Sequence, residues 1–268
     1  MARAKRSLGQ NFLIDPNLQR KIVDELAAGA DDVVLEVGPG HGELSRHLAG
    51  AVHRLVLVEK DGALGAELEA RWGGDESIRI VVGDALEIDL SAFHEEGRDL
   101  RIISNVPYNI TSPLIFAFLD IRPPPRRLVL TVQREVADRI VAGPGSRTYG
   151  ALSVGVQAVA EARIAFGVGR RAFRPVPDVE SAALVIDPAP DRMAAVDTGA
   201  LRTVTRAMFG RRRKQIQKIL RTAPELASRL DAASLPERIG ALPTDRPEAL
   251  SPEQFIAIAS ALVGEGES

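Results

Sequence analysis

Residues 33–42 have the sequence Val33-Val34-Leu35-Glu36-Val37-Gly38-Pro39-Gly40-His41-Gly42. The first five residues predict a short, buried β-strand. The glycines that follow let the backbone turn sharply and approach a ligand closely. A helix is expected next, through Leu44 and Leu48. A strand, a glycine-rich turn and a helix in this order indicate an α/β fold.

The same alternation continues along the chain. Further strands are predicted at residues 55–58, 78–82, 100–104, 128–132, 164–168 and 182–186. Helices are expected between them, among them one that begins at Pro16 behind an Asp15 N-cap and ends at Gly29, and others at 111–119 and 151–160. The pattern predicts a mostly parallel, seven-stranded sheet with helices on both faces.

A change of pattern follows Pro188 and Pro190, beyond which the sequence predicts helices alone. We therefore expect two domains, an α/β domain at 1–188 and a small all-helical domain at 189–268. The helical part is strongly basic: between Thr198 and Ala223 there are eight Arg or Lys and no Asp or Glu. Such a segment favours contact with a polyanion such as nucleic acid over a merely solvated helix face.

Composition narrows the possible functions. The chain of 268 residues is 45% hydrophobic and contains no cysteine, which excludes disulfides, thiolate nucleophiles and cysteine metal ligands. The four histidines lack the spacing of metal ligands, so no metal site is expected. No apolar run approaches the roughly 20 residues of a membrane span, and the basic N-terminus lacks the apolar stretch of a secretory signal. We expect a cytoplasmic protein.

Acidic and polar side chains follow several predicted strands. In parallel sheets, ligands bind beyond the carboxyl ends of the strands. Glu59 can accept hydrogen bonds from ribose hydroxyls, and Asp84 from the amine of an adenine. The glycines depart from the dinucleotide pattern, and Glu36 suits a cationic amino acid moiety better than a pyrophosphate. These features favour S-adenosylmethionine, with a dinucleotide or a plain tight turn as the alternatives.

The turn Asn105-Val106-Pro107-Tyr108 follows the strand at 100–104. By itself it could be a packing turn. Alternatively, the Asn105 oxygen and a backbone carbonyl of Val106 or Pro107 could accept the two hydrogens of an adenine amine and make its nitrogen more nucleophilic. Tyr108 would stack on the base, and Phe173, in a loop stiffened by Pro175 and Pro177, could cover its other face. The base would have to be unstacked.

The sequence closely resembles the ribosomal RNA adenine N6-dimethyltransferases of the kasugamycin-sensitivity family. The matching motifs span nearly the whole chain: residues 8–13 (Leu-Gly-Gln-Asn-Phe-Leu), 35–40, 105–110 with 112–114, 133–137, 149–154, 173–177 (Phe-Arg-Pro-Val-Pro) and 212–214. The resemblance implies a Rossmann-like class I methyltransferase domain. The Asn105 turn has Val106 where the family usually has Leu. The loop at 173–177 is followed by Asp178 where the family has a basic residue, which weakens the expectation that this loop binds phosphate.

The resemblance also implies roles for individual residues. The expected S-adenosylmethionine site comprises Asn11, Leu13, Gly38, Gly40, Glu59, Asp84, Ala85 and Asn105, and the expected adenine site comprises Asn105, Val106, Pro107, Tyr108 and Phe173. RNA contact is expected from Arg211, Arg212, Arg213, Lys214 and Lys218. Relatives dimethylate two adjacent adenosines near the 3′ end of small-subunit rRNA in a late precursor particle, and we expect a monomer with that partner.

Three other functions remain open at this point. The first is a large-subunit adenine methyltransferase of the macrolide-resistance type. The 149–154 motif and the arginine-rich segment argue against this function. The second is a non-catalytic nucleic-acid-binding or ribosome-assembly factor that keeps the fold. The third is a Rossmann oxidoreductase, which the glycine spacing and the missing acid–base candidate disfavour. NAD binding without S-adenosylmethionine binding would identify the third.

Overall fold

The computed structural model describes residues 10–264. The predictions for the basic N-terminus and for the beginning of the 8–13 motif lie outside this range. The chain forms two compact units. The first contains the residues up to Ala137 and Arg163–Pro188, and the second contains Asp138–Ala162 and the residues from Ala189.

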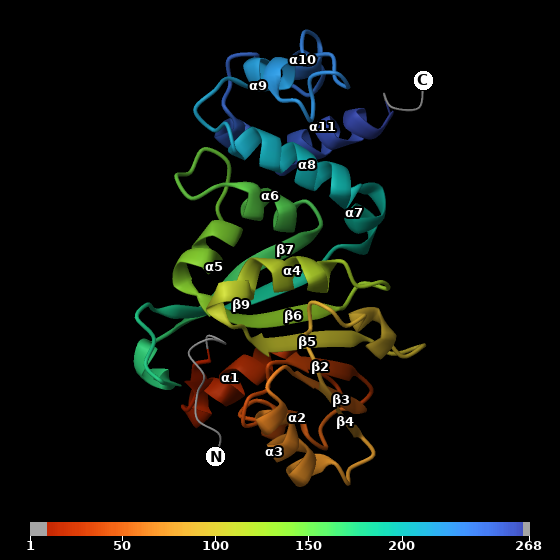
Figure 1. Ribbon diagram of the computed structural model, residues 1–268, viewed down its shortest axis with the longest axis vertical. Coiled ribbons are helices and arrows are strands. Elements are labelled where there is room, and N and C mark those ends of the chain that lie inside the picture. The colour runs from red at the N-terminus through yellow and green to blue at the C-terminus, as the bar shows by residue number, and fades with distance from the viewer. Residues whose placement is uncertain (1–9, 265–268) are drawn as a thin grey trace. The chain divides into compact units, whose positions relative to one another are not determined.

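A seven-stranded sheet with the order β4-β3-β2-β5-β6-β9-β7 forms the first unit (Figure 1). Its strands are β2 (Val33–Val37), β3 (Arg54–Glu59), β4 (Ile78–Val82), β5 (Leu100–Asn105), β6 (Arg127–Gln133), β7 (Ala160–Val168) and β9 (Ser181–Pro188). The strands from β4 to β6 are parallel, and β9 is antiparallel to β6. All seven predicted strands are present, and the predicted fold class is confirmed.

The chain order reverses at β2. From this strand the chain runs outward through β3 to β4, and it then returns to the other side of β2 as β5. The connections after β2 and β5 therefore lead away from each other, which leaves a crevice at the carboxyl ends of these two strands. This crevice is where the glycine turn and the Asn105 turn lie.

Three helices cover one face of the sheet: α1 (Pro16–Leu26), α2 (Ser45–Leu48) and α3 (Gly62–Trp72). Their apolar side chains, including Ile22, Leu48 and Leu68, share one buried cluster with side chains of β2, β3, β5 and β6. Burial of this face accounts for the apolar spacing along the helices. The remaining helices of the region are α4 (Thr111–Leu119) and α5 (Arg134–Ile140), with single turns η2 (Leu90–Phe93), η3 (Tyr108–Ile110) and η4 (Arg170–Ala172).

Helix boundaries differ from the prediction in three places. Helix α1 is capped as predicted, because the Asp15 side chain accepts from the N–H groups of Asn17 and Leu18. It ends at Leu26 rather than Gly29, since Ala27 adopts the left-handed conformation (φ 50°) usually left to glycine. Helix α2 begins only at Ser45, and the helix predicted at 151–160 stops at 157 because the chain enters β7.

A two-stranded sheet attaches the N-terminal segment to the first unit. Strand β1 (Phe12–Leu13) pairs antiparallel with β8 (Phe173–Arg174), so that Phe12 is opposite Arg174 and Leu13 is opposite Phe173. The Ile14 N–H donates to the Ala172 carbonyl at 2.7 Å, and the Gln19 side chain donates to the Leu13 carbonyl at 2.6 Å. These bonds hold residues 10–12 beside the crevice.

The second unit is built around helix α8. It comprises α6 (Ala151–Gln157), α7 (Pro190–Ala195), α8 (Thr198–Phe209), α9 (Ile216–Thr222), α10 (Leu235–Arg238), η5 (Pro247–Ala249) and α11 (Pro252–Gly264). Helix α8 packs against α6, α9 and α11 (Figure 1). Phe209 stacks on Phe255 with ring centroids 5.3 Å apart, and the buried Tyr149 donates to the Leu250 carbonyl. Residues 138–162 therefore belong with the helical unit, whereas the predicted division at 188 placed them with the sheet.

Candidate active site

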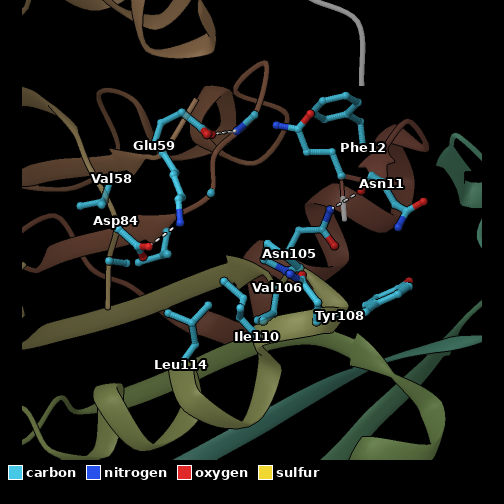
Figure 2. Close-up of a pocket in the computed structure, with 18 of the residues that line it drawn as sticks. Asn11, Phe12, Val58, Glu59, Asp84, Asn105, Val106, Tyr108, Ile110 and Leu114 are labelled. Atoms are coloured by element: carbon cyan, nitrogen blue, oxygen red, sulfur yellow. Dashed lines mark hydrogen bonds and ion pairs between the residues drawn. The ribbon is translucent and has the colours of Figure 1, made fainter. Parts of the chain in front are cut away.

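A cavity of about 170 Å³ opens at the carboxyl ends of the sheet (Figure 2). It lies within the first unit. It is lined by Gln10, Asn11, Phe12, Val37, Gly38, Gly40, Val58, Glu59, Lys60, Gly83, Asp84, Ala85, Asn105, Val106, Pro107, Tyr108, Asn109, Ile110 and Leu114. Glu59 and Asp84 lie toward one side of the view and Asn105, Val106 and Tyr108 toward another. The lining thus comes from the ends of four adjacent strands.

The glycine turn depends on backbone conformations and close contacts that side chains would prevent. Gly38, Gly40 and Gly42 all have positive φ. A Cβ atom on Gly40 would lie 2.9 Å from the Phe12 ring, and one on Gly42 would lie 2.5 Å from Trp72. At Gly38 no atom comes within 4 Å of the Cβ position, although this residue lines the cavity. Gly38 therefore leaves open space that a ligand can enter.

Glu59 ties the glycine turn to strand β3. One carboxylate oxygen accepts from the Gly40 N–H at 3.1 Å (Figure 2). The other accepts from the Asp61 N–H at 2.8 Å. The side chain is 5% exposed, and burial raises its pKa against these two hydrogen bonds. Each carboxylate oxygen can accept a further hydrogen bond, so Glu59 can bind the hydroxyls of a ligand while holding the turn.

Asp84 is paired with a residue that the sequence analysis did not select. The Lys60 ammonium forms an ion pair with one Asp84 oxygen (Figure 2). The Leu86 N–H donates to the other Asp84 oxygen at 3.0 Å. The side-chain bond from Lys60 is the main cause that lowers the pKa of Asp84. Asp84 therefore stays ionised as a hydrogen-bond acceptor at the rim of the cavity.

Glu36 lies beneath the glycine turn and does not line the cavity. It is 1% exposed and accepts a 2.6 Å hydrogen bond from the Ser45 hydroxyl. Its pKa is raised to about 8, chiefly by burial and also by the carboxylates of Glu43 and Glu59, while the Ser45 bond opposes the shift. The sequence predicted that Glu36 would contact a ligand directly. In the structure the glycine turn, and not Glu36, lines the cavity.

The Asn105 turn is fixed by several hydrogen bonds. The Val106 N–H donates to the Thr131 carbonyl at 3.1 Å. The Pro107 carbonyl accepts from the Ile110 N–H at 3.1 Å and from the Thr111 hydroxyl at 3.3 Å. These bonds shape the backbone so that Asn105, Val106 and Pro107 all face the cavity.

The Asn105 side chain is oriented by the N-terminal segment. Its amide nitrogen donates to the Asn11 carbonyl at 2.7 Å (Figure 2). Because this bond uses the nitrogen, the side-chain oxygen remains available as an acceptor. Three residues on, the Tyr108 hydroxyl shares a 2.6 Å hydrogen bond with the Ser181 hydroxyl, which leaves the ring as part of the cavity wall.

Most of the predicted site residues come together in this cavity, and two do not. Asn11, Gly38, Gly40, Glu59, Asp84, Ala85 and Asn105 to Tyr108 line it. Leu13 and Phe173 are each 1% exposed and belong to the buried cluster behind the β1–β8 pair. Phe173 therefore packs in the core in this structure and does not cover the site, because its pairing with Leu13 directs both side chains inward.

The cavity also contains residues that the sequence analysis missed. Gln10, Phe12 and Lys60 are polar, aromatic or cationic lining residues, and Asn109, Ile110 and Leu114 extend the Asn105 turn. Lys60 directly follows Glu59, so its position at a strand end was the available signal. For Phe12 the signal was its place in the 8–13 motif between Asn11 and Leu13, and its pairing with β8 brings it to the cavity.

The predicted cationic residues divide into two groups in the second unit. Arg211 interacts with Glu225 at 3.7 Å, and Arg212 donates to the Arg147 carbonyl at 3.1 Å and approaches Glu248 at 3.5 Å. Both therefore serve packing within the unit. Arg213, Lys214 and Lys218 are exposed, and no ion pair or hydrogen bond of their side chains is found among residues 10–264. These three are the cations available to an external polyanion.

Two further features concern ions and membranes. Among the residues that the structure describes, no group of three or more His, Asp or Glu side chains is arranged to hold a metal ion. Within the same range, none of the helices has the length and apolar character that crossing a bilayer requires.

The parallel sheet with its carboxyl-edge cavity defines a class I methyltransferase fold. The chain belongs to the ribosomal RNA adenine dimethylase family, which it matches over residues 1–260. It is 42% identical over 262 residues to a protein of Nitratidesulfovibrio vulgaris (strain DP4) named ribosomal RNA small subunit methyltransferase A, with 97% of each chain covered. The resemblance, the enzyme class and the fold predicted from the sequence are thereby confirmed.

Two solved structures show how far the fold extends beyond close relatives. A dimethyladenosine transferase from Plasmodium falciparum is 23% identical, covers 95% of this chain and 98% of its own, and superposes with a TM-score of 0.82. The 23S rRNA methyltransferase ErmE is 25% identical, covers 94% and 100%, and gives a TM-score of 0.69. Both similarities cover nearly the entire chain, so the helical part belongs to the shared fold.

The burial of Glu36 generates a prediction for stability. An unfolded glutamate ionises near pH 4.5 but folded Glu36 only near pH 8. The stability that protonated Glu36 contributes is present below about pH 4.5 and is lost as the pH rises through 8. We expect Glu36→Gln, which does not titrate, to become more stable than the wild type as the pH rises, by up to a few kcal/mol on the order-of-magnitude scale of such shifts.

Urea unfolding at pH 5, 7 and 9 measures this difference. Glu96→Gln, at an exposed glutamate of the same unit, is the control and should show no such trend. A stability difference between Glu36→Gln and the wild type that stays constant from pH 5 to pH 9 would contradict the assignment.

Proposed function

We propose that the protein transfers methyl groups from S-adenosylmethionine to N6 of two adjacent adenosines near the 3′ end of small-subunit rRNA. The observation that carries this proposal is the joining of two sites in one cavity, with Glu59 and Asp84 at one side and the Asn105 turn at the other. The name of the Nitratidesulfovibrio relative supports the small subunit as the substrate. We further propose that a monomer acts in the cytoplasm on a late precursor particle.

The residues of the cavity fit the chemistry of S-adenosylmethionine. Glu59 would accept hydrogen bonds from the ribose hydroxyls and Asp84 from the adenine amine, while Gly38 and Gly40 leave room for the ligand beside the turn. Asn11, whose carbonyl holds Asn105, would line the path between the cofactor and the target. When bound, the cofactor supplies an electrophilic methyl group on a sulfonium.

The target amine would be held by two acceptors of the turn. An adenine amine is a weak nucleophile because its lone pair is delocalised into the ring, and acceptors that bind both hydrogens favour a pyramidal nitrogen. The Asn105 oxygen is one acceptor. The Val106 carbonyl is the other, because the Pro107 carbonyl already accepts from Ile110 and Thr111. Positioning of this kind contributes much of the acceleration in a displacement reaction.

Tyr108 would stack on the target base. Its hydroxyl is anchored to Ser181, so the ring has a defined orientation in the cavity wall. Stacking on an aromatic ring compensates for part of the cost of unstacking a base from RNA. The methylated amine loses its proton readily, so the turn needs no general base. We retain Phe173 as a support for this region through its pairing with Leu13 rather than as a second stacking surface.

The exposed cations of the second unit would bind the RNA backbone. Arg213, Lys214 and Lys218 are free of partners among residues 10–264 and lie in a segment without acids. Contacts to phosphate release counterions and make binding depend on salt. Arg211 and Arg212 would act indirectly, by holding the shape of the segment.

The acceptor role of Asn105 is tested by substitution. Asn105→Ala should lower kcat for methyl transfer to undermethylated small subunits by about 100-fold, the scale of losing one positioned catalytic hydrogen bond. Asn105→Asp keeps acceptor oxygens and should retain more activity than Asn105→Ala. Asn17→Ala, on the exposed part of α1, is the matched control.

Labelled cofactor and mass spectrometry give the measurement, with undermethylated small subunits, mature large subunits and naked RNA as substrates. Label found on the large subunit alone would contradict the proposed substrate and would indicate a 23S rRNA substrate, as in the name of ErmE. Near-normal kcat in Asn105→Ala would show that the amine is held by other groups.

The glycine turn predicts that substitutions at Gly38 and Gly50 have similar effects on stability but different effects on cofactor binding. Gly38→Ala and Gly50→Ala both force an alanine into positive φ with open space around the new methyl group. Each should lose about 1–2 kcal/mol of stability from this conformation. Only Gly38 lines the cavity, so only Gly38→Ala should also weaken S-adenosylmethionine binding, by about tenfold or more. Calorimetric titration and urea unfolding of the pair measure the two effects, and equal cofactor affinities would remove Gly38 from the site.

The cationic surface predicts a change in salt dependence. Replacing Arg213, Lys214 and Lys218 with glutamine should weaken binding to small subunits and reduce the slope of log K against log salt by about 0.7–0.9 for each phosphate that the variant no longer neutralises. Arg126→Gln removes an exposed cation at the amino end of β6, the edge of the sheet away from the cavity, and should leave the slope unchanged. An unchanged slope in the triple variant would place the RNA-binding surface elsewhere.

A further inference from the structure

Glu36 occupies the centre of the sheet, between the strands that supply the two sides of the site. In β2 it pairs with Leu57 of β3 and with Ile103 of β5. The strand β3 leads to Glu59, and β5 leads to Asn105. The next residues after Glu36, Val37 and Gly38, line the cavity. Its carboxyl group is thus one layer below the region between the cofactor side and the target side.

The charges that face Glu36 are of its own sign. From β3 it faces Glu59 and from the segment before α2 it faces Glu43, and both carboxylates act on it unfavourably. The neighbouring residues of β5, Ile103 and Ser104, are uncharged. Ser45 of α2 donates one hydrogen bond at 2.6 Å.

The basic residues of α2 do not offset this charge. Arg46 and His47 both direct their side chains to the Gln19 oxygen of α1. A buried carboxyl group among like charges keeps its proton unless a cation compensates the ionised form. Within residues 10–264, no side chain that acts on Glu36 supplies that cation.

The cavity can accommodate the missing cation. Its charged lining residues are Glu59, Lys60 and Asp84, and Lys60 is already paired with Asp84. The charge left over is that of Glu59, with Glu36 and Glu43 behind it. A cationic ligand in the cavity would be attracted by the ionised forms of these carboxyl groups, and a neutral ligand of the same shape would not. Because Glu36 is 1% exposed, solvent screens its interaction with such a charge only weakly.

We propose that Glu36 is a specificity-determining residue that makes the cavity bind the cationic S-adenosylmethionine in preference to S-adenosylhomocysteine, the neutral-sulfur product. The inference rests on the proposed function. In the transfer, the bond from sulfur to the methyl carbon breaks and its electron pair stays on sulfur, while a bond from N6 to that carbon forms and N6 loses a proton to solvent. The positive charge of the cofactor therefore disappears with each turnover, which weakens the hold on the product.

The protonation of Glu36 follows the charge in the cavity. Because burial raises the pKa of this carboxyl group to about 8, it carries a proton in the empty cavity at neutral pH. An opposite charge nearby favours the ionised form. Cofactor binding therefore releases a proton near pH 7, and the preference for the cation increases as the pH rises toward and above 8.

The test compares two ligands in two proteins. Calorimetric titration gives the affinities of S-adenosylmethionine and S-adenosylhomocysteine for the wild type and for Glu36→Gln. The ratio of the two affinities should fall about tenfold in Glu36→Gln, equivalent to about 1.4 kcal/mol. In the wild type the ratio should rise between pH 6 and pH 9, and in the variant it should not. Titration of the ligand's own amine contributes equally in both proteins and cancels in the comparison.

A second variant and a second readout keep the test decisive. Ser45→Ala removes the bond that favours the ionised carboxyl, so the rise of the ratio should move to higher pH. Titration in buffers of different ionisation enthalpy counts the proton released, which should be absent in Glu36→Gln. An affinity ratio and a proton count that are the same in Glu36→Gln and the wild type would overturn the inference. Failure of the wild type to bind S-adenosylmethionine at all would instead overturn the proposed function.

Discussion

The parallel pairing of β2 with both β3 and β5 is the constraint on which the rest of the structure depends. It brings the ends of three strands to one edge, so that Glu36, Glu59 and Asn105 approach one another although up to 69 residues separate them. The reversal of strand order at β2 keeps the connections from filling the crevice between them. The cavity, its acidic side and its amide turn all follow from that arrangement.

Hydrogen bonds to the backbone convert this arrangement into a specific site. Glu59 holds the glycine turn through the Gly40 N–H, and the Asn11 carbonyl holds Asn105. In both cases a functional side chain joins the scaffold through hydrogen bonds and keeps acceptor capacity for a ligand. The result is a preorganised site in which little reordering is needed when a ligand binds. A similar division separates the cations of the second unit, where Arg212 supports the loop at Arg147 and Lys214 stays exposed.

Much of the fold and the site was predictable because local chemistry and periodicity specify it. The run at 33–37 is short, bounded by a glycine turn and apolar except for Glu36, which favours a buried strand, and Asp15 before Pro16 is a strong helix start. Asp84 and Asn105 were identifiable because polar residues at the ends of parallel strands meet at one edge. The end of α1 was not predictable, because Ala27 takes a conformation that its neighbours impose and that its own side chain disfavours.

The sequence by itself determined the class of fold, the family and most of the residues that line the cavity, since these depend on short motifs and their order. Features that depend on pairing between distant segments of the chain were decided by the tertiary structure alone. The β1–β8 pair brings Phe12 to the cavity and removes Phe173 from it, and the packing of Tyr149 joins residues 138–162 to the helical unit. It also put Glu36 behind the glycine turn among like charges. Whether an acid meets a ligand or acts from beneath it depends on which face of the strand it occupies and on what covers that face.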